Sequence, residues 1–95
     1  MRKTMMSPEG NIELYRLLGK WYPVAAGMPE GEDFDFDSEI YDSMDVIFRH
    51  RDDVEAASAG VQGVFRFSFE ETVPLGEIRP VVMEAFEIIE LYKEP

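Results

Sequence analysis

The sequence lacks cysteine altogether and contains a single histidine, His50, among its 95 residues. Without cysteine the chain forms no disulfide bond and offers no thiolate ligand to a metal ion. His50 lies between Arg49 and Arg51, and these two positive charges disfavour the protonated imidazole that a Ser–His pair must form. We therefore expect no nucleophilic catalysis, and we predict that the protein is not an enzyme.

Long hydrophobic runs are also missing, and no apolar stretch approaches the length of a membrane span. The first three residues, Met1-Arg2-Lys3, resemble the start of a signal peptide, but residues 7–10 (SPEG) interrupt the chain where an apolar segment would have to follow. We therefore expect a cytoplasmic protein that does not bind membranes. The chain is too short for two ordinary domains, and its 45% of hydrophobic residues suffices for a core, so residues 1–95 are predicted to form a single domain.

Basic residues are scarce, because nine lysines and arginines face 20 acids and the formal charge is −11. This charge has the wrong sign for a protein that binds nucleic acid directly, which needs a basic face to displace counterions. The charge is also uneven along the chain. Residues 1–29 carry four bases and two acids (+2), whereas residues 30–95 carry five bases and eighteen acids (−13).

The negative charge is most concentrated in an acidic segment, residues 30–45, which contains no base. Its eight acids are Glu30, Glu32, Asp33, Asp35, Asp37, Glu39, Asp42 and Asp45. Phe34, Phe36 and Tyr41 are interleaved with them and could supply apolar anchors to a charged surface. Prolines and glycines predict a loop over residues 23–37, in which Phe34 and Phe36 would face the core and the intervening aspartates would face outward.

The two ends of the chain carry clear helical patterns. At the first end, Pro8 and the spacing of the apolar residues predict a helix over residues 8–20, closed by Gly19 or by Pro23. At the other end, Pro80 is expected at the first position of an amphipathic helix. Its apolar face would hold Val82, Ala85, Phe86, Ile89 and Tyr92, and its opposite face Glu84, Glu87, Glu90 and Glu94.

The middle of the chain is ambiguous. Residues 40–48 fit a helix begun by Asp37 or Ser38, but residues 44–50 also fit a strand. Asp52 is expected to cap a short helix that Gly60 stops. In residues 61–70, alternating phenylalanines and flanking glycines favour a strand, because a helix leaves Phe67 on the polar side. We therefore predict a small α+β domain with an N-terminal helix, a central sheet region and a C-terminal amphipathic helix; an all-α bundle is the alternative.

No cofactor or metal is expected. Asp33, Asp35 and Asp37 follow the spacing that opens an EF-hand loop, but Ser38 stands where that loop needs glycine and Met44 where it needs a bidentate glutamate. The sequence contains no phosphate-binding loop, dinucleotide fingerprint or zinc spacing. An enzyme that uses carboxylates is the least supported class, since 20 acids single out no pair.

The acidic segment, with its aromatic residues, favours a docking surface for a basic protein. We predict a small inhibitor of a basic, nucleic-acid-handling partner such as a nuclease toxin, with all eleven acidic and aromatic residues named above as candidate contacts. In size, acidity and lack of catalytic residues the chain resembles immunity proteins against bacterial nuclease toxins, and also anti-restriction and anti-CRISPR proteins, although no sequence motif supports the resemblance. The alternative is a homo-oligomeric structural or regulatory module, in which the phenylalanine-rich strand pairs across a two-fold axis of a homodimer.

Overall fold

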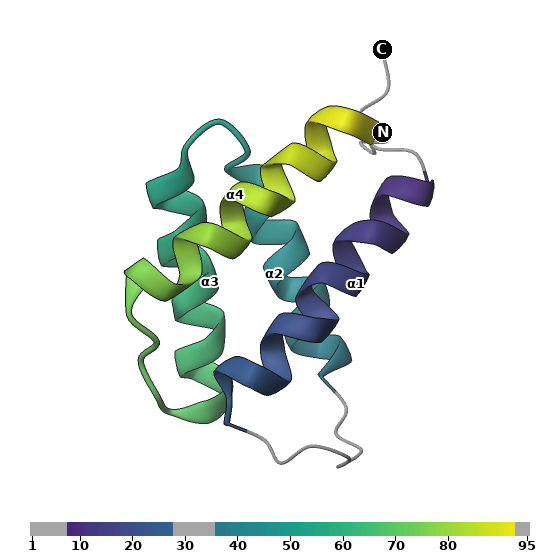
Figure 1. Ribbon diagram of the computed structural model, residues 1–95. Coiled ribbons are helices and arrows are strands. Elements are labelled where there is room, and N and C mark those ends of the chain that lie inside the picture. The colour runs from purple at the N-terminus through teal and green to yellow at the C-terminus, as the bar shows by residue number, and fades with distance from the viewer. Residues whose placement is uncertain (1–7, 28–35, 93–95) are drawn as a thin grey trace.

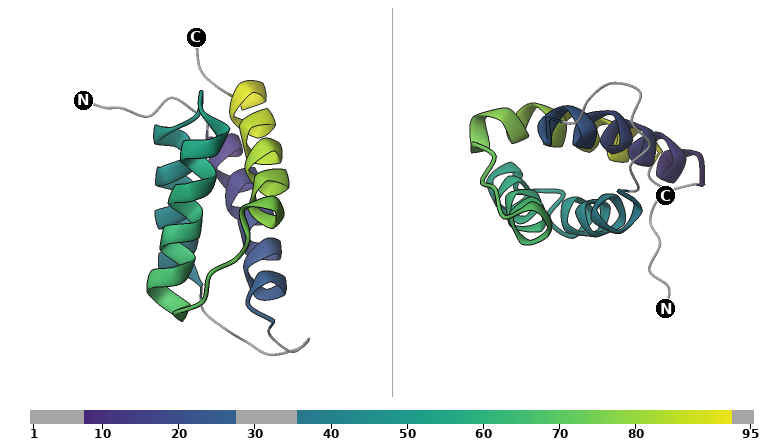
Figure 2. Two further views of the ribbon diagram at one scale, coloured as in Figure 1. Left: turned by 90° about the vertical axis from the view of Figure 1, so that its left-hand side faces the viewer. Right: turned by 90° about the horizontal axis from the view of Figure 1, so that it is seen from below.

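The structure, a computed structural model, describes residues 8–27 and 36–92, and in these ranges the chain forms helices and no strand (Figure 1). The helices are α1 (Pro8–Ala25), α2 (Asp37–Arg49), α3 (Val54–Phe69) and α4 (Leu75–Tyr92). The antiparallel pair α2 and α3 forms one layer and packs against a second layer of α1 and α4 (Figure 2). The predicted α+β fold is therefore wrong, and the all-α bundle that was its alternative is the fold. None of the described helices is both long and apolar enough to cross a membrane.

All but the last residue of the predicted strand over residues 61–70 belong to α3, which runs through both Gly60 and Gly63 without a break. The residues that α3 buries have helical spacing, since Val61 and Phe65 are fully buried and lie four residues apart. Phe67 is 89% exposed. The strand prediction was wrong because it required Phe67 to be buried together with Phe65 and Phe69.

Gly60 allows α3 to approach α2 closely. A Cβ atom at this position would overlap Cγ1 of Val46 on α2. The short third helix that Gly60 was expected to stop is therefore wrong, because the glycine serves packing between helices and does not end one. Asp53, and not Asp52, caps α3, since its carboxylate accepts a hydrogen bond from the backbone N–H of Ala56 at 3.2 Å.

Both prolines that were expected to mark helix ends lie inside helices. Pro23 is within α1, which continues to Ala25, and Pro80 is the sixth residue of α4. A glycine precedes each proline by four residues, at Gly19 and Gly76. A proline ring crowds the carbonyl group of the residue four positions earlier, and a glycine there has the backbone freedom to adjust. Gly27, with a φ of 69°, and not Gly19, follows the end of α1.

The second half of the acidic segment and the residues that follow it form a single helix. α2 begins at Asp37 and continues to Arg49, so the strand alternative for residues 44–50 is wrong. Neither Asp37 nor Ser38 is the cap, because the residue before the helix is Phe36, which makes no side-chain capping bond. Asp37 and Glu39 in the first turn nevertheless favour the helix, since carboxylates stabilise the positive end of the helix dipole.

Aromatic rings from α3 and from the residue that precedes α2 pack around Tyr22 of α1 in the core. The Tyr22 ring stacks on Phe65 at 5.8 Å and on Phe36 at 5.9 Å between centroids. Phe69 lies 4.7 Å from Phe65 and 5.7 Å from Phe36. These contacts join α1, the residue before α2, and α3. Aromatic pairs of this kind contribute about 0.5–1.5 kcal/mol each beyond the area that they bury.

Contacts beyond the core hold α4 against α3. Gln62 of α3 donates a hydrogen bond of 2.8 Å to the carbonyl oxygen of Val73, a buried residue in the connection between the two helices. Arg79 of α4 forms two hydrogen bonds, of 2.7 and 3.0 Å, with the carboxylate of Glu55 at the start of α3. The hydrogen bond from Arg79 lowers the pKa of Glu55, although both side chains are solvent-accessible.

The hydroxyl group of Tyr22 is buried and lies 2.5 Å from Oγ of Ser43, which is buried as well. Each hydroxyl satisfies the other, because a buried polar group without a partner costs about 1–3 kcal/mol. The pKa of Tyr22 is raised to about 12, and burial is the main cause. The hydrogen bond with Ser43 lowers the pKa by less than burial raises it, and the nearby carboxylates of Glu39 and Asp42 make the smallest contributions, both of which raise it.

Replacing Tyr22 with phenylalanine is expected to lower the free energy of unfolding by about 1–2 kcal/mol at pH 7, because Ser43 loses its partner. The loss is expected to shrink to zero and then change sign as pH rises from 10 to about 12. In this window the wild type loses about 2–3 kcal/mol, since the unfolded tyrosine ionises while the folded one stays protonated. Urea unfolding at a series of pH values measures both effects. A constant difference between the two proteins up to pH 12 would contradict the assignment, and the Tyr22→Phe/Ser43→Ala double variant should recover part of the loss at pH 7.

Candidate functional site

The acidic segment falls partly within the described residues. Glu30, Glu32, Asp33, Phe34 and Asp35 lie outside them, so the structure does not place these five predicted contacts. The other six belong to α2 or directly precede it: Phe36, Asp37, Glu39, Tyr41, Asp42 and Asp45. The candidate site is built from these six residues and from what packs beside them.

Phe36 is part of the core and not of the surface. Its side chain is 7% exposed and packs between the rings of Tyr22 and Phe69. This position matches the expectation that a ring of the acidic segment would face inward, and it fixes the entry of the chain into α2. Glu39 is half-buried and lies near enough to Tyr22 to contribute to the raised pKa of that tyrosine.

The exposed residues of the segment share the outer face of α2. Asp37, Tyr41 and Asp45 follow one another at intervals of four residues, which places them in one row along the helix. Asp42 is exposed next to this row. Tyr41 is 59% exposed, so a large ring lies in the middle of a row of carboxylates. We call Asp37, Tyr41, Asp42 and Asp45 the acidic face of α2.

An open hollow of about 410 Å³ lies beside this face, between α1 and α2. Its lining is mostly apolar and comes from Asn11, Ile12, Tyr15, Tyr41 and Met44. The rings of Tyr15 and Tyr41 are 5.5 Å apart between centroids, so they join the two helices across the hollow. Tyr15 also donates a hydrogen bond from its hydroxyl group to the carboxylate of Asp37. The carboxylates of α2 therefore border an apolar depression, which we call the α1/α2 hollow.

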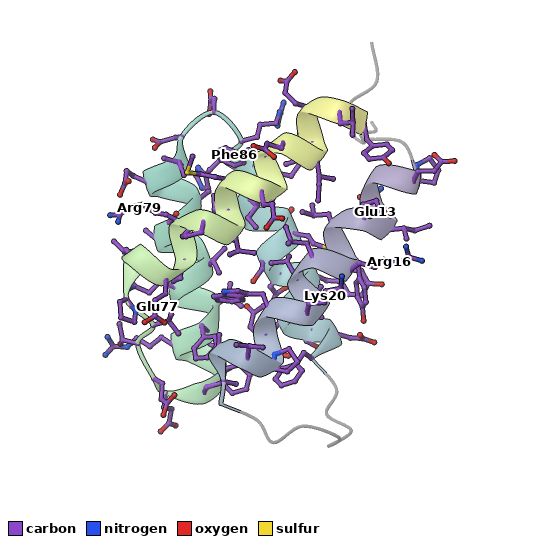
Figure 3. All side chains as sticks on the ribbon, viewed as in Figure 1. Glu13, Arg16, Lys20, Glu77, Arg79 and Phe86 are labelled. Carbon is purple, nitrogen blue, oxygen red and sulfur yellow. The ribbon has the colours of Figure 1, made fainter. Side chains whose placement is uncertain are left out.

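Two arginines of the described residues, one on α2 and one on α1, form ion pairs within their own helices. Arg49 forms an ion pair with Asp45 one helical turn away, and both side chains are exposed. On α1, Arg16 lies 3.4 Å from the carboxylate of Glu13, and Figure 3 labels both residues. Exposed pairs of this kind contribute about 0–1 kcal/mol, so a partner can replace them at little cost.

The residues of α1 that line the hollow were not predicted from the sequence. Ile12 is 52% exposed, and Tyr15 and Asn11 are half-buried on the side of α1 that faces α2. A signal was present, because Ile12 does not lie on the face that α1 buries, which is formed by Leu14, Leu18 and Tyr22. Which helix would lie beside Ile12 depends on tertiary packing and could not be read from this pattern.

The predicted row of glutamates on α4 is also on the surface. Glu84, Glu87 and Glu90 are exposed, whereas Glu94 lies outside the described residues. A second open hollow, of about 470 Å³, lies over α4 between Phe86 and Leu91. It is lined by residues of one helix only, and no second element closes it. The α1/α2 hollow is the better candidate because two helices frame it.

The arrangement of acidic side chains in the described part of the chain also bears on metal binding. No group of three or more histidine, aspartate or glutamate side chains comes together there in an arrangement that could hold a metal ion. Of the EF-hand-like spacing, Asp33 and Asp35 lie outside the described residues, and Asp37 accepts the hydroxyl of Tyr15. The exposed carboxylates of the acidic face of α2 are groups that form charge-assisted hydrogen bonds with cations.

Comparison with known proteins places the chain in a structural context. Residues 13–92 match the family model described as a domain of unknown function, DUF1871. Among solved structures, the fold is similar to the crystal structure of a protein from Bacillus stearothermophilus, with a TM-score of 0.75 and 19% sequence identity. The match covers 90% of this chain and 98% of that chain. At this identity the likeness extends to the fold alone. No curated protein sequence matches the chain significantly.

Proposed function

The chain belongs to the DUF1871 family, and because that family is defined without a function, we propose from the surface of this member that it is a small, non-enzymatic protein-binding module. Its partner is a basic protein, and nucleases or other nucleic-acid-handling proteins have the required charge. In binding such a partner the module acts as an inhibitor, because its carboxylates compete for the basic surface that would otherwise bind phosphates.

The observation that supports this proposal most directly is the exposure of Tyr41 within the row of carboxylates on α2. Tyrosine is among the residues that dominate binding energy at protein interfaces, and it supplies a large contact area with few rotatable bonds. The carboxylates around it supply long-range attraction, which raises the association rate more than the final affinity. Apolar and charged contributions to binding are thus combined on one short helix.

Two charge-reversed variants test the proposal. Asp42→Lys/Asp45→Lys changes the acidic face of α2, and Glu84→Lys/Glu87→Lys makes the same change in net charge on the surface of α4. Each is immobilised and used to capture proteins from the cells that produce it, beside the wild type. We expect the wild type and the α4 variant to retain the same basic protein, which high salt releases, and the α2 variant to lose it. Equal retention by all three proteins would rule out the acidic face of α2 as the binding surface.

A second candidate function rests on a different residue. Phe67 of α3 is 89% exposed, and phenylalanine is enriched at protein interfaces relative to the rest of the surface. It favours a homo-oligomeric structural or regulatory module, in which α3 meets a second copy of the chain as a helix and not as the strand predicted from the sequence. The mass in solution separates the two candidates, because a monomer has 10.9 kDa and a homodimer twice that value.

A further inference from the structure

We infer that the α1/α2 hollow receives an apolar side chain of a basic amphipathic helix, whose lysines or arginines pair with the acidic face of α2. This inference rests on the proposed protein-binding function and specifies the partner segment and its position. The hollow, and not the charge alone, then determines which segment of a partner binds.

The lining of the hollow indicates an apolar occupant. Ile12 and Tyr41 are 52% and 59% exposed, and both contribute side chains to its wall. Met44 is half-buried, also lines the hollow, and has the flexible, polarisable side chain that adapts to different apolar groups. The volume of about 410 Å³ falls within the range of about 300–1,000 Å³ that is usual for ligand sites.

The backbone chemistry of the hollow favours a helical segment over an extended one. An extended peptide needs the free edge of a sheet for its backbone hydrogen bonds, and the described residues form no strand. The walls of the hollow are helices, whose backbone groups bond within each helix. An amphipathic helix satisfies its own backbone and presents only side chains, so it is the form of peptide that an apolar groove between helices can accept.

The charge beside the hollow requires basic residues on that segment. Asp37 borders the hollow through its bond to Tyr15, and Asp45 lies one turn from Tyr41 on the same helix face. Arg49 already holds the carboxylate of Asp45 and shows how a guanidinium group docks there. A cation of the partner helix replaces Arg49 in this exposed pair, so Arg49 competes with the partner.

The test uses a synthetic peptide of about 18 residues, long enough to form a helix in water, with leucines along one face and lysines beside them. Its binding to the full chain is followed by nuclear magnetic resonance. We expect saturable shifts at Ile12, Tyr15, Tyr41 and Met44. Replacing Arg49 with alanine should tighten binding about two- to fivefold, because it removes the competing cation.

A matched pair of variants on α1 tests the role of the hollow. Ile12→Ser removes an apolar wall of the hollow, and Val24→Ser removes an exposed apolar side chain at the other end of the same helix. We expect Ile12→Ser to weaken peptide binding roughly five- to tenfold and Val24→Ser to leave it unchanged. Equal effects of the two variants, shifts spread over α4, or a second copy of the chain found in the hollow would each overturn the inference.

The outcome is separable from that of the proposed function. If the peptide ignores the hollow while Asp42→Lys/Asp45→Lys still abolishes capture of a basic partner, the acidic face binds that partner by another kind of segment and only the inference fails. If the charge reversal has no effect on capture, the proposed function fails, whatever the peptide does.

Discussion

Replacing Phe65 with alanine is expected to lower the free energy of unfolding by about 3–5 kcal/mol, the largest effect of any substitution considered for this chain. Phe65 is fully buried, and its ring contacts those of Trp21, Tyr22 and Phe69. Alanine leaves a cavity among rings held by α1 and α3, and these helices cannot close it without losing other contacts. Since small domains have a stability of only about 5–15 kcal/mol, the variant should melt far below the wild type.

Phe67→Ala is the matched control for this change. The same residue type is removed from the same helix two positions away, but Phe67 is 89% exposed, and we expect a change within about 0.5 kcal/mol. Thermal and urea unfolding followed by circular dichroism measure both variants. Similar losses in the two variants would contradict the helical assignment of residues 61–70, because a strand buries Phe65 and Phe67 on one face.

Replacing Gly60 with alanine is expected to destabilise the bundle by about 2 kcal/mol. The added methyl group overlaps Cγ1 of Val46, and a branched side chain on a helix has few other rotamers to adopt. Overpacking of this kind costs up to about 3 kcal/mol, and the better helix propensity of alanine returns about 1 kcal/mol. The melting temperature should fall by roughly 8–16 °C.

Gly63→Ala makes the same chemical change one turn further along α3, where nothing lies within 4 Å of the added atom. It should stabilise the protein by about 0.5–1 kcal/mol, because only the gain in helix propensity remains. Val46→Ala introduced together with Gly60→Ala should restore part of the loss, since the clashing atom is then absent. A Gly60→Ala variant as stable as the Gly63→Ala variant would show that α2 and α3 are not so close.

Local patterns in the sequence correctly predict a helix near each end of the chain, because several helical signals agree there. The first helix begins at Pro8 as predicted, and the apolar face predicted for the last helix is largely buried, with Val82, Ala85 and Ile89 in the core. The predicted end of the first helix was wrong because Pro23 was treated as a barrier, and the predicted start of the last helix was wrong because Pro80 was placed at its first position. A proline inside a helix costs about 3 kcal/mol in isolation, and the tertiary packing of a whole amphipathic face can offset this cost.

The middle of the chain could not be assigned from local patterns alone. Phe65, Phe67 and Phe69 alternate as in a strand, whereas Val61, Phe65 and Phe69 are spaced as in a helix, so both periods are present. The decision comes from a neighbour that is distant in sequence. Gly60 of α3 lies against Val46 of α2, and this contact joins two segments that are more than ten residues apart in the chain.

The candidate site was predictable only in part, for a similar reason. The charge of the acidic segment and the position of Tyr41 within it can be read from the sequence, and the structure exposes Tyr41 beside Asp37, Asp42 and Asp45 on α2. The hollow requires Ile12 and Tyr15, which precede Tyr41 by more than 25 residues in the chain. Their approach is a result of the packing of α1 against α2.

The proposed docking of a basic partner on the acidic face of α2 is tested most directly by the rate constant for their association. This rate constant is measured, at low and at high salt, with the basic partner that the protein captures. If the acidic face of α2 steers the partner, Asp42→Lys/Asp45→Lys should slow association at low salt by about tenfold or more, and Glu84→Lys/Glu87→Lys should slow it much less. High salt should remove most of the difference between these variants. Equal slowing by the two variants would contradict the account, because binding would then depend on the total charge and not on the acidic face of α2.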